Sequence, residues 1–214
     1  KYIFKNLNFC LVPSQKIKNE FIKIYNPNQI HIMGDTRFDQ IIDRRNQNNE
    51  IELLKLICNQ SFNIIFGSYD QYDESMIIES LSSHYPEGEK SLTKNNHKII
   101  LVPHEIHNNE INAMALKLKN NGFKPYLYSK LNKEEIKKIN LLFIDVVGIL
   151  ADIYKYTQLA YVGSGFNDGV HSVIEPGIHG NVVSFGPNIE LLDEAKYMYK
   201  NKIGYMIKNS QNMI

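Results

Sequence analysis

The strongest local feature of the sequence is LAYVGSGFNDGVHSVIEPG, residues 159–177, and it indicates the class of fold. An apolar run at Leu159–Val162 has the length of a buried strand, and it leads into a glycine-rich turn at residues 163–169. A segment of helical period follows from about His171. A strand, a glycine-rich turn and a helix in this order are typical of the βα unit of a parallel α/β sheet.

Short apolar runs alternate with segments of helical period along the rest of the chain. This alternation predicts a Rossmann-like α/β fold, a doubly wound and mainly parallel sheet with helices on both faces. We expect strands at Asn8–Val12, Gln29–Met33, Asn63–Gly67, Lys98–Val102, Lys124–Tyr128, Leu141–Ile144, Leu159–Val162 and Val182–Phe185. We expect helices at Ser14–Tyr25, Glu50–Asn59, Asn109–Asn121, Val147–Tyr156, His171–His179 and Ile189–Lys200, and one more that Ser68 or Asp70 would cap.

Residues 34–49, GDTRFDQIIDRRNQNN, break the alternation with a glycine, several charges and a polar end. This composition predicts a linker. Residues 1–40 would then be the end of a preceding domain with the start of the linker, and residues 41–214 would be one Rossmann-like domain. Because the chain starts at Lys1 rather than at a methionine, we expect it to be part of a longer protein.

The composition excludes several classes of protein. The 24 basic and 23 acidic residues give a net charge of +1, so nothing favours a nucleic-acid partner. Cys10 and Cys58 are the only cysteines, which excludes a disulfide framework and a cysteine-based zinc site. No run of about 18 apolar residues that would predict a transmembrane helix occurs. We expect this part of the protein to be soluble and to bind no metal.

Ligands of open α/β sheets bind beyond the carboxyl ends of the strands, and the turn at 163–169 follows such an end. Glycines allow positive φ angles and a close approach of the backbone to a ligand, and the amide groups at a helix start favour a phosphate. Glu175, about one turn into the predicted helix, is near enough to reach a hydroxyl pair of a bound ribose. The same residues also fit a structural turn in which Ser172 caps the helix and Glu175 accepts from its first N–H groups.

Two nucleotide-binding motifs are excluded. The spacing of the turn is G-x-G-x-x-x-G rather than the dinucleotide pattern G-x-G-x-x-G, and no acidic residue ends the next strand at Ser184–Phe185. The pattern G-x-x-x-x-G-K-[ST] does not occur in the sequence. A hydride-transfer enzyme and a P-loop nucleotidase are therefore not expected.

Further titratable side chains follow other predicted strands. LVPHEIH, residues 101–107, places two histidines and a glutamate after a strand, but H-E-x-H is not the helical zinc spacing, so a loop with a helix cap is the alternative to a site. In FGSYDQYDESM, residues 66–76, Asp73 and Glu74 would lie in the first turn of a helix, where its dipole favours them. Gly148 interrupts the start of another predicted helix, where it costs stability unless the space is needed.

Taken together, these loops resemble the Kdo transferases, which move 3-deoxy-D-manno-octulosonic acid (Kdo) from its CMP-activated form onto a lipid A precursor. The resemblance covers most of the chain and is most specific between Asp145 and Asn188. The form of the loop with His104 and Glu105 resembles the Bacteroidetes branch of the family. The motifs that carry the resemblance are GDTRFDQ (34–40), FGS (66–68), LVPHEI (101–106), DVVGILADIYKYTQLAYVGSGF (145–166), GVHSVIEPGIHG (169–180) and FGPN (185–188).

The resemblance implies a GT-B architecture of two Rossmann-like domains, with this chain as the donor-binding C-terminal half. It implies that the turn at 163–169 and the helix at His171–Glu175 hold the phosphate and ribose of CMP. Gly148 and its neighbours would face the cytosine, and the loop at 101–107 would lie near the sugar. Two positions depart from the family's pattern: Ser164 replaces the second glycine of an expected Gly-Gly pair, and Ser172 replaces an expected asparagine. The donor-binding residues so implied are Ser68, His104, Glu105, Gly148, Ile149, Gly163, Ser164, Gly165, Gly169, His171, Ser172 and Glu175.

The implied reaction is a metal-independent, inverting transfer of Kdo with CMP as the leaving group, so CMP-Kdo is a substrate and no cofactor is expected. The general base of the family is a glutamate of the first domain that this chain does not contain. We therefore expect no catalytic residue here and no activity from this part alone. The full-length protein would meet its lipid A precursor at the cytoplasmic face of the inner membrane, through its N-terminal part. The alternatives are a GT-B transferase or epimerase that uses another nucleotide sugar, and a non-catalytic nucleotide-binding module.

Overall fold

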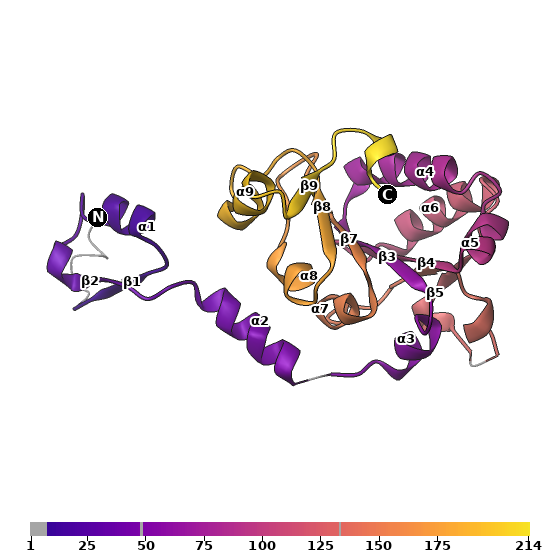
Figure 1. Ribbon diagram of the computed structural model, residues 1–214, viewed down its shortest axis with the longest axis horizontal. Helices are drawn as coiled ribbons and strands as arrows, with labels where there is room; N and C mark the ends of the chain where they lie inside the picture. The colour runs from indigo at the N-terminus through magenta and orange to yellow at the C-terminus, as the bar shows by residue number, and fades with distance from the viewer. Residues whose placement is uncertain (1–7, 48, 133) are drawn as a thin grey trace. The chain divides into compact units, whose positions relative to one another are not determined.

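The chain divides into two compact units, residues 1–48 and 49–214. The computed structural model describes residues 8–47, 49–132 and 134–214 (Figure 1). The strands are β1 (Cys10–Val12), β2 (Ile30–Ile32), β3 (Phe62–Tyr69), β4 (His97–Pro103), β5 (Pro125–Leu127), β6 (Leu141–Phe143), β7 (Leu159–Val162), β8 (Val182–Phe185) and β9 (Gly204–Met206). The α-helices are α1 (Gln15–Phe21), α2 (Thr36–Asn46), α3 (Glu52–Ile57), α4 (Gln71–His84), α5 (Glu89–Asn95), α6 (Asn108–Asn120), α7 (Leu150–Ile153), α8 (Ile174–Ile178) and α9 (Asp193–Lys200).

The first unit contains a small parallel βαβ arrangement in which α1 connects β1 to β2. The predicted strands and helix of this region are confirmed, although α1 ends at Phe21 rather than at Tyr25. Ser14 caps α1, as expected, because its hydroxyl oxygen accepts a hydrogen bond from the N–H of Ile17 at 3.3 Å. Residues 1–7 of the predicted preceding domain lie outside the described residues.

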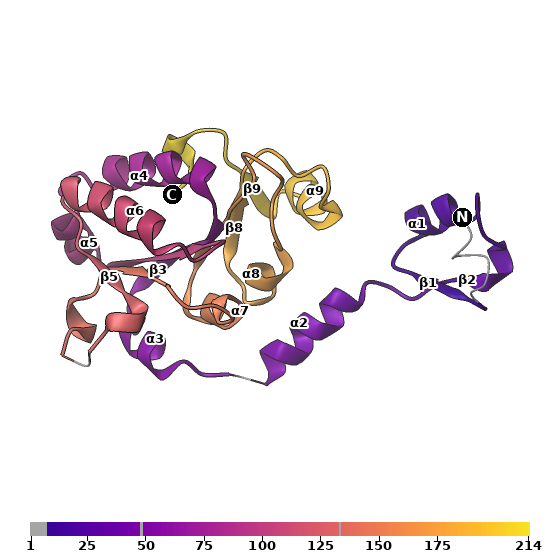
Figure 2. The ribbon, with the colours of Figure 1, turned by 180° about the vertical axis from the view of Figure 1, so that it is seen from behind.

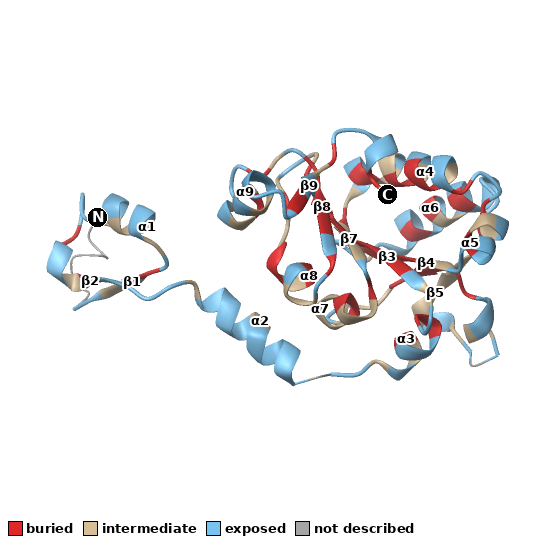
Figure 3. Ribbon diagram, in the orientation of Figure 1, coloured by how far each residue is buried: buried red, intermediate tan, exposed pale blue. Residues whose placement is uncertain are grey.

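The stretch predicted to be a linker, residues 34–49, is mostly helical, since α2 occupies most of it. Asp35 caps the helix by accepting from the N–H of Arg37 at 3.0 Å, and Phe38 and Ile42 recur at the helical spacing of four residues. The charges that indicated a linker are the solvated surface of this helix, of which no residue is buried (Figure 3). The predicted domain boundary at residue 40 lies inside α2, while the two compact units divide after residue 48.

The second unit is built on a seven-stranded sheet in the order β5-β6-β4-β3-β7-β8-β9, within the described residues. Every neighbouring pair in it is parallel, which confirms the predicted Rossmann-like α/β fold. The strands β4, β5 and β6 all lie to one side of β3 in the strand order. The chain then crosses back, and β7 pairs with the opposite edge of β3. The carboxyl ends of β3 and β7 therefore form a topological switch point, where open α/β sheets bind ligands.

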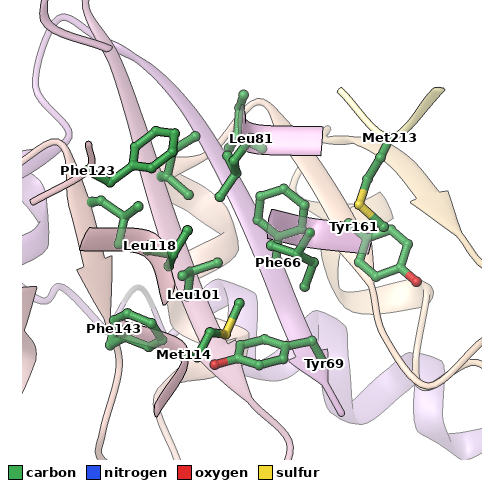
Figure 4. Close-up of a cluster of buried hydrophobic side chains, with 14 of the residues drawn as sticks. Phe66, Tyr69, Leu81, Leu101, Met114, Leu118, Phe123, Phe143, Tyr161 and Met213 are labelled. Carbon is green, nitrogen blue, oxygen red and sulfur yellow. The ribbon is translucent and has the colours of Figure 1, made fainter. Parts of the chain in front are cut away.

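Alternate residues of the central strands pack against helices on opposite faces of the sheet, as the period of two in a strand requires. Phe66 of β3 belongs to a buried cluster with side chains of α4, α5 and α6, whereas Ile65 belongs to a second cluster with side chains of α3 and α7. Figures 1 and 2 show these two sets of helices on either side of the sheet. Figure 4 shows the first cluster, in which Met213 of the C-terminal segment lies beside Tyr161 of β7.

Several elements differ from the sequence prediction. The strand β9 and the helix α5 were not expected. Of the two caps predicted for the helix after β3, Ser68 or Asp70, the structure has Asp70, which caps α4. The predicted helix at Val147–Tyr156 is a short α7 continued by a 3-10 turn at Tyr154–Tyr156. The predicted helix at Ile189–Lys200 begins only at Asp193. A short element such as β9 has too few residues to show a periodic pattern. It is a strand because it pairs with β8.

Candidate functional site

The loops singled out in the sequence all leave the same edge of the sheet, because the strands that precede them are parallel. Ser68 lies at the end of β3, and the loop with His104 and Glu105 follows β4. Gly148 and Ile149 follow β6, and the turn at 163–169 follows β7. The fold thus brings the predicted donor-binding residues to one edge, around the switch point.

Two of the predicted glycines are required by the fold itself. A Cβ on Gly163 would lie 2.4 Å from the carbonyl oxygen of Ser68 and from Cα of Tyr69, far inside van der Waals contact. A Cβ on Gly165 would lie 2.6 Å from the backbone of Gly186, in the loop after β8. These glycines let the end of β3 and the loops after β7 and β8 meet backbone to backbone. Their presence in the motif therefore has a structural reason that is independent of a ligand.

The loop after β7 is held by a dense set of backbone hydrogen bonds. The N–H of Gly163 donates to the carbonyl of Gly67 at 2.9 Å, and the N–H of Asn188 donates to the carbonyl of Gly165 at 2.9 Å. Gly169 has a φ of +121° and lies beside Asn188. The N–H of Val170 in turn donates to the carbonyl of Asn188 at 3.0 Å, so backbone hydrogen bonds in both directions join the loops after β7 and β8.

Ser164, which stands where the family's pattern has a glycine, adopts a left-handed backbone with a φ of +65°. Residues with a Cβ are strained in this region, and glycine is not. The side chain of Ser164 is also buried. The position at which the sequence departs from the family's pattern is therefore a strained residue, and it lies at the carboxyl end of β7.

His104 and His171 form a stacked pair across the switch point. Their ring centroids are 4.2 Å apart with an angle of 17° between the ring planes. The backbone holds both residues, because the N–H of His104 donates to the carbonyl of Tyr69 at 2.9 Å and the N–H of His171 donates to the carbonyl of Gly163 at 3.4 Å. The structure thus joins two predicted site residues that lie far apart in the sequence.

Burial, and secondarily the neighbouring His104, lower the pKa of His171 below its ordinary value. Its Nε2 atom is buried and has no hydrogen-bond partner among the described residues. Buried polar atoms are normally satisfied. A neutral imidazole with a free nitrogen at the ligand edge is able to donate to, or accept from, a bound molecule.

A pocket of about 200 Å³ opens between the first turns of α4 and α6. His107 is held in it by Glu105, whose carboxylate lies 2.9 Å from the Nε2 atom of His107 and raises the pKa of that histidine. Burial raises the pKa of Glu74, whose carboxylate lies 3.4 Å from Nζ of Lys117. The sequence prediction did not include the other carboxylates here as site residues. The pocket is lined by Tyr69, Asp70, Gln71, Glu74, Pro103, His104, Glu105, His107, Glu110 and Ile111.

The loop after β6 is more open than the loop after β7. Gly148 has a φ of +88°, and no atom lies within 4 Å of a Cβ placed on it. Val147 is 83% exposed, whereas Ile149 packs partly against the cluster around Ile65. The carboxylate of Asp145 accepts from both the N–H and the hydroxyl of Ser129, at 2.8 and 2.5 Å, and so fixes the start of this loop.

The helix that was expected to begin at His171 or Ser172 begins at Ile174, so the prediction that Ser172 caps it is wrong. The N-cap position belongs to Val173, which makes no side-chain capping bond. Pro176 explains the shift, because proline is tolerated in the first turn of a helix and disrupts the interior. A helix starting at His171 would have placed Pro176 in its interior. Glu175 is consequently the second residue of a short helix, and it is half-buried.

In the described residues, no group of three or more His, Cys, Asp or Glu side chains is arranged to hold a metal ion. No helix within the described ranges combines the length and the apolar character needed to cross a membrane.

A parallel α/β sheet with closely packed loops at its switch point defines the second unit as a Rossmann-like domain. Its fold matches the solved C-terminal CMP-Kdo binding domain of WaaA from Acinetobacter baumannii, with a TM-score of 0.60, 16% identity and coverage of 81% of this chain and 83% of that one. The fold class is therefore that of the C-terminal half of a GT-B glycosyltransferase.

Sequence comparison points to the same family. The chain is 27% identical to the 3-deoxy-D-manno-octulosonic acid transferase of Aquifex aeolicus over 75% of its length and 44% of the relative. It is 22% identical to the transferase of the same name from Rickettsia conorii over 99% of its length and 44% of the relative. It is 29% identical to a bifunctional glycosyltransferase/methyltransferase of Fusobacterium nucleatum over 56% of its length and 19% of the relative. No family model matches the chain.

These matches confirm the predicted resemblance to the Kdo transferases. The narrower resemblance to the Bacteroidetes branch stays a prediction. The chain spans less than half the length of these curated relatives, so the activity, substrates and partners of the whole protein are proposals.

Proposed function

We propose that this chain is the donor-binding part of a glycosyltransferase that takes Kdo from CMP-Kdo. The observation that supports it most directly is the coincidence of three things at one edge of the sheet. The switch point, the family motifs that follow β3, β4, β6, β7 and β8, and the paired imidazoles of His104 and His171 all lie there. A likeness of fold alone would not support a function, since one fold serves many.

In this proposal the phosphate and ribose of CMP lie over the loop after β7. The carboxylate of Glu175 accepts hydrogen bonds from the hydroxyl groups of the ribose. The cytosine lies beside the open loop at Gly148, where the exposed Val147 offers an apolar contact. The free nitrogen of His171 would donate to the departing phosphate. Fixed donors aimed at a developing negative charge stabilise it without the cost of reorganisation.

The sugar would extend toward the pocket that contains His104 and Glu105. Because four carboxylates line this pocket, at Asp70, Glu74, Glu105 and Glu110, it suits hydroxyl groups as ligands and opposes an anion. The carboxylate of Kdo would then point away from the pocket, with the hydroxyl-bearing side chain of the sugar toward it.

The finer features of the reaction are carried over from the resemblance. Transfer would be inverting and metal-independent, with a lipid A precursor as the acceptor at the cytoplasmic face of the inner membrane. The general base would be a glutamate of a preceding domain that this chain lacks, and this part would position the donor and stabilise the leaving group. We therefore expect no Kdo transfer from this chain alone, and product from CMP-Kdo and a lipid A precursor would contradict that expectation.

The first unit would be the last part of that preceding domain. Its two strands and the residues that flank them expose large apolar side chains, with Phe9 61%, Leu11 49%, Ile32 48% and Met33 62% exposed. A two-stranded sheet is not stable by itself in water, and apolar surface of this kind marks a contact with further structure. This supports the sequence prediction that residues before about 40 continue another domain.

Calorimetric titration of the 214-residue chain with CMP tests the proposal. We expect CMP to bind, UDP to bind more weakly and NAD not to bind. Glu175→Ala is expected to weaken CMP binding at least tenfold, because it removes the acceptor for the ribose hydroxyl groups. Glu79→Ala on the exposed surface of α4 is the matched control and should leave the affinity unchanged. Tighter binding of UDP than of CMP would favour the alternative of another nucleotide sugar, and no effect of Glu175→Ala would remove the ribose assignment.

A further inference from the structure

A buried carboxylate lies beneath the proposed donor site. The side chain of Asp73, the third residue of α4, is 0% exposed. Its Oδ1 accepts from the hydroxyl of Tyr161 at 2.6 Å, and its Oδ2 accepts from the N–H of Ser164 at 2.8 Å and from the N–H of Asp70 at 3.0 Å. A carboxylate is retained in a protein interior only when its oxygen atoms are satisfied in this way.

The three donors come from three segments that meet at the switch point. Asp70 is the N-cap of α4, directly after β3. Tyr161 belongs to β7, and Ser164 lies in the loop that follows it. Asp73 thus connects the two strands between which the chain changes direction in the sheet. An N-capping role alone would explain only the bond from Asp70.

The bond to Ser164 falls on the strained residue of the loop. Ser164 holds a φ of +65° without being glycine, and such a conformation persists only where the surroundings fix it. Its carbonyl oxygen accepts from the N–H groups of Asn167 and Gly169, at 3.2 and 3.0 Å. The neighbouring carbonyl of Gly163 accepts from the N–H of His171. The path of the loop up to the stacked imidazole therefore depends on the conformation of Ser164.

We propose that Asp73 is a positioning residue of the donor site: its carboxylate, fixed by the hydroxyl of Tyr161, holds Ser164 in the left-handed conformation and so preforms the loop from Gly163 to His171 for a nucleotide. Asp73 does not contact the ligand itself. The role in nucleotide binding rests on the proposed function, whereas the control of the loop rests on the contacts of Asp73 alone.

Amide hydrogen exchange combined with CMP titration tests this assignment on the 214-residue chain. The informative amides are those of Gly169 and His171, which do not bond to Asp73 and would not respond to the loss of a local cap. In Asp73→Ala we expect them to exchange at least tenfold faster and CMP to bind at least tenfold more weakly. The amides of Ile99 and Leu101 in β4 should keep their wild-type rates.

Two variants separate positioning from capping. Asp73→Asn keeps the shape, since its carbonyl oxygen accepts from Ser164 and Asp70 while its NH₂ group donates to the oxygen of Tyr161, so it should restore slow exchange and CMP binding to within about threefold. Asp70→Ala removes the capping bonds of the side chain to Tyr72 and Asp73 but leaves the carboxylate of Asp73 in place. It should leave the loop amides unchanged.

Wild-type exchange at Gly169 and His171 in Asp73→Ala would overturn the proposal. If Asp73→Ala does not fold, Tyr161→Phe removes only the hydroxyl that fixes the carboxylate, and it should speed exchange of the same amides at least threefold. Unchanged rates in Tyr161→Phe would then also overturn the proposal. Should the wild-type chain fail to bind CMP, the proposed function fails, and the exchange rates still decide whether Asp73 controls the loop.

Discussion

The loops after β7 and β6 leave the same edge of the sheet, and both were expected to face the donor, yet the protein holds them very differently. In the loop after β7, backbone groups of residues 163–170 bond to β3 and to the loop after β8, and Gly163 lies against the backbone of Ser68 and Tyr69. In the loop after β6, Gly148 has open space around it and Val147 is 83% exposed. A glycine in a family motif can therefore mark either a packing requirement or an open surface.

Substitution of the two glycines gives the largest expected contrast. In Gly163→Ala the new methyl group would lie 2.4 Å from backbone atoms of Ser68 and Tyr69. These backbone atoms cannot move away as the end of a flexible side chain would. We expect the free energy of unfolding to fall by about 3 kcal/mol, as for severe overpacking. Gly148→Ala meets no atom and adds only the strain of a positive φ, of about 1–2 kcal/mol. Urea unfolding of both variants measures the difference, and equal losses would contradict the distinction between the two loops.

Ser164→Gly should strengthen the tightly held loop. Glycine removes the strain of the left-handed conformation, about 1–2 kcal/mol, and adds about 0.5–1 kcal/mol of conformational entropy to the unfolded chain. The net expectation is a gain of about 0.5–1 kcal/mol in the free energy of unfolding. The urea midpoint at constant slope reports this gain. A loss of stability would show that the conformation of Ser164 is not strained in its surroundings.

The stacked imidazole at the end of the same loop gives the smallest expected effect. The pKa of His171 lies below the ordinary value of 6.5 because of burial and of His104, so the unfolded chain binds a proton more readily than the folded one. The contribution of this group to stability is complete above pH 6.5 and is lost as the pH falls toward the pKa of the folded state. Histidine NMR signals should show His171 titrating below 6.5 and His107, beside Glu105, titrating above it.

The same NMR titration of the variant His104→Ala tests the effect of His104 on the pKa of His171. The substitution removes the ring that stacks on His171, so it should raise the pKa of His171 toward 6.5. If His171 already titrated at or above 6.5 in the wild-type chain, the stacked and buried environment described for it would be wrong.

Patterns confined to neighbouring residues predicted much of the fold. The bounds of β7 and β8 coincide with the predicted strands, because a buried parallel strand appears as a short, continuous apolar run. The helix α2 was not predicted, because a helix without buried residues has a polar composition like that of a loop. The start of α8 was also misplaced, although Pro176 was the available signal.

In the candidate site, too, local sequence patterns predicted some features and missed others. The sequence motifs indicated which loops would meet, since all parallel strands present their carboxyl ends to one edge. They did not indicate that Asp73 bonds to Tyr161, 88 residues away in the sequence, or that His104 stacks on His171. No local spacing predicts such pairs, because they depend on which strands become neighbours in the sheet.

The class of fold, the order of its loops and the resemblance to the Kdo transferases could all be predicted from the sequence. Each of these follows from residue types at short spacings, where the chain's own geometry fixes which side chains share a face. Only the tertiary structure decided that Gly163 and Gly165 serve backbone packing, that Ser164 is strained and that a buried carboxylate holds it. Those properties arise where β3 and β7 lie side by side, and burial and hydrogen bonding across that boundary exist only after the sheet has formed.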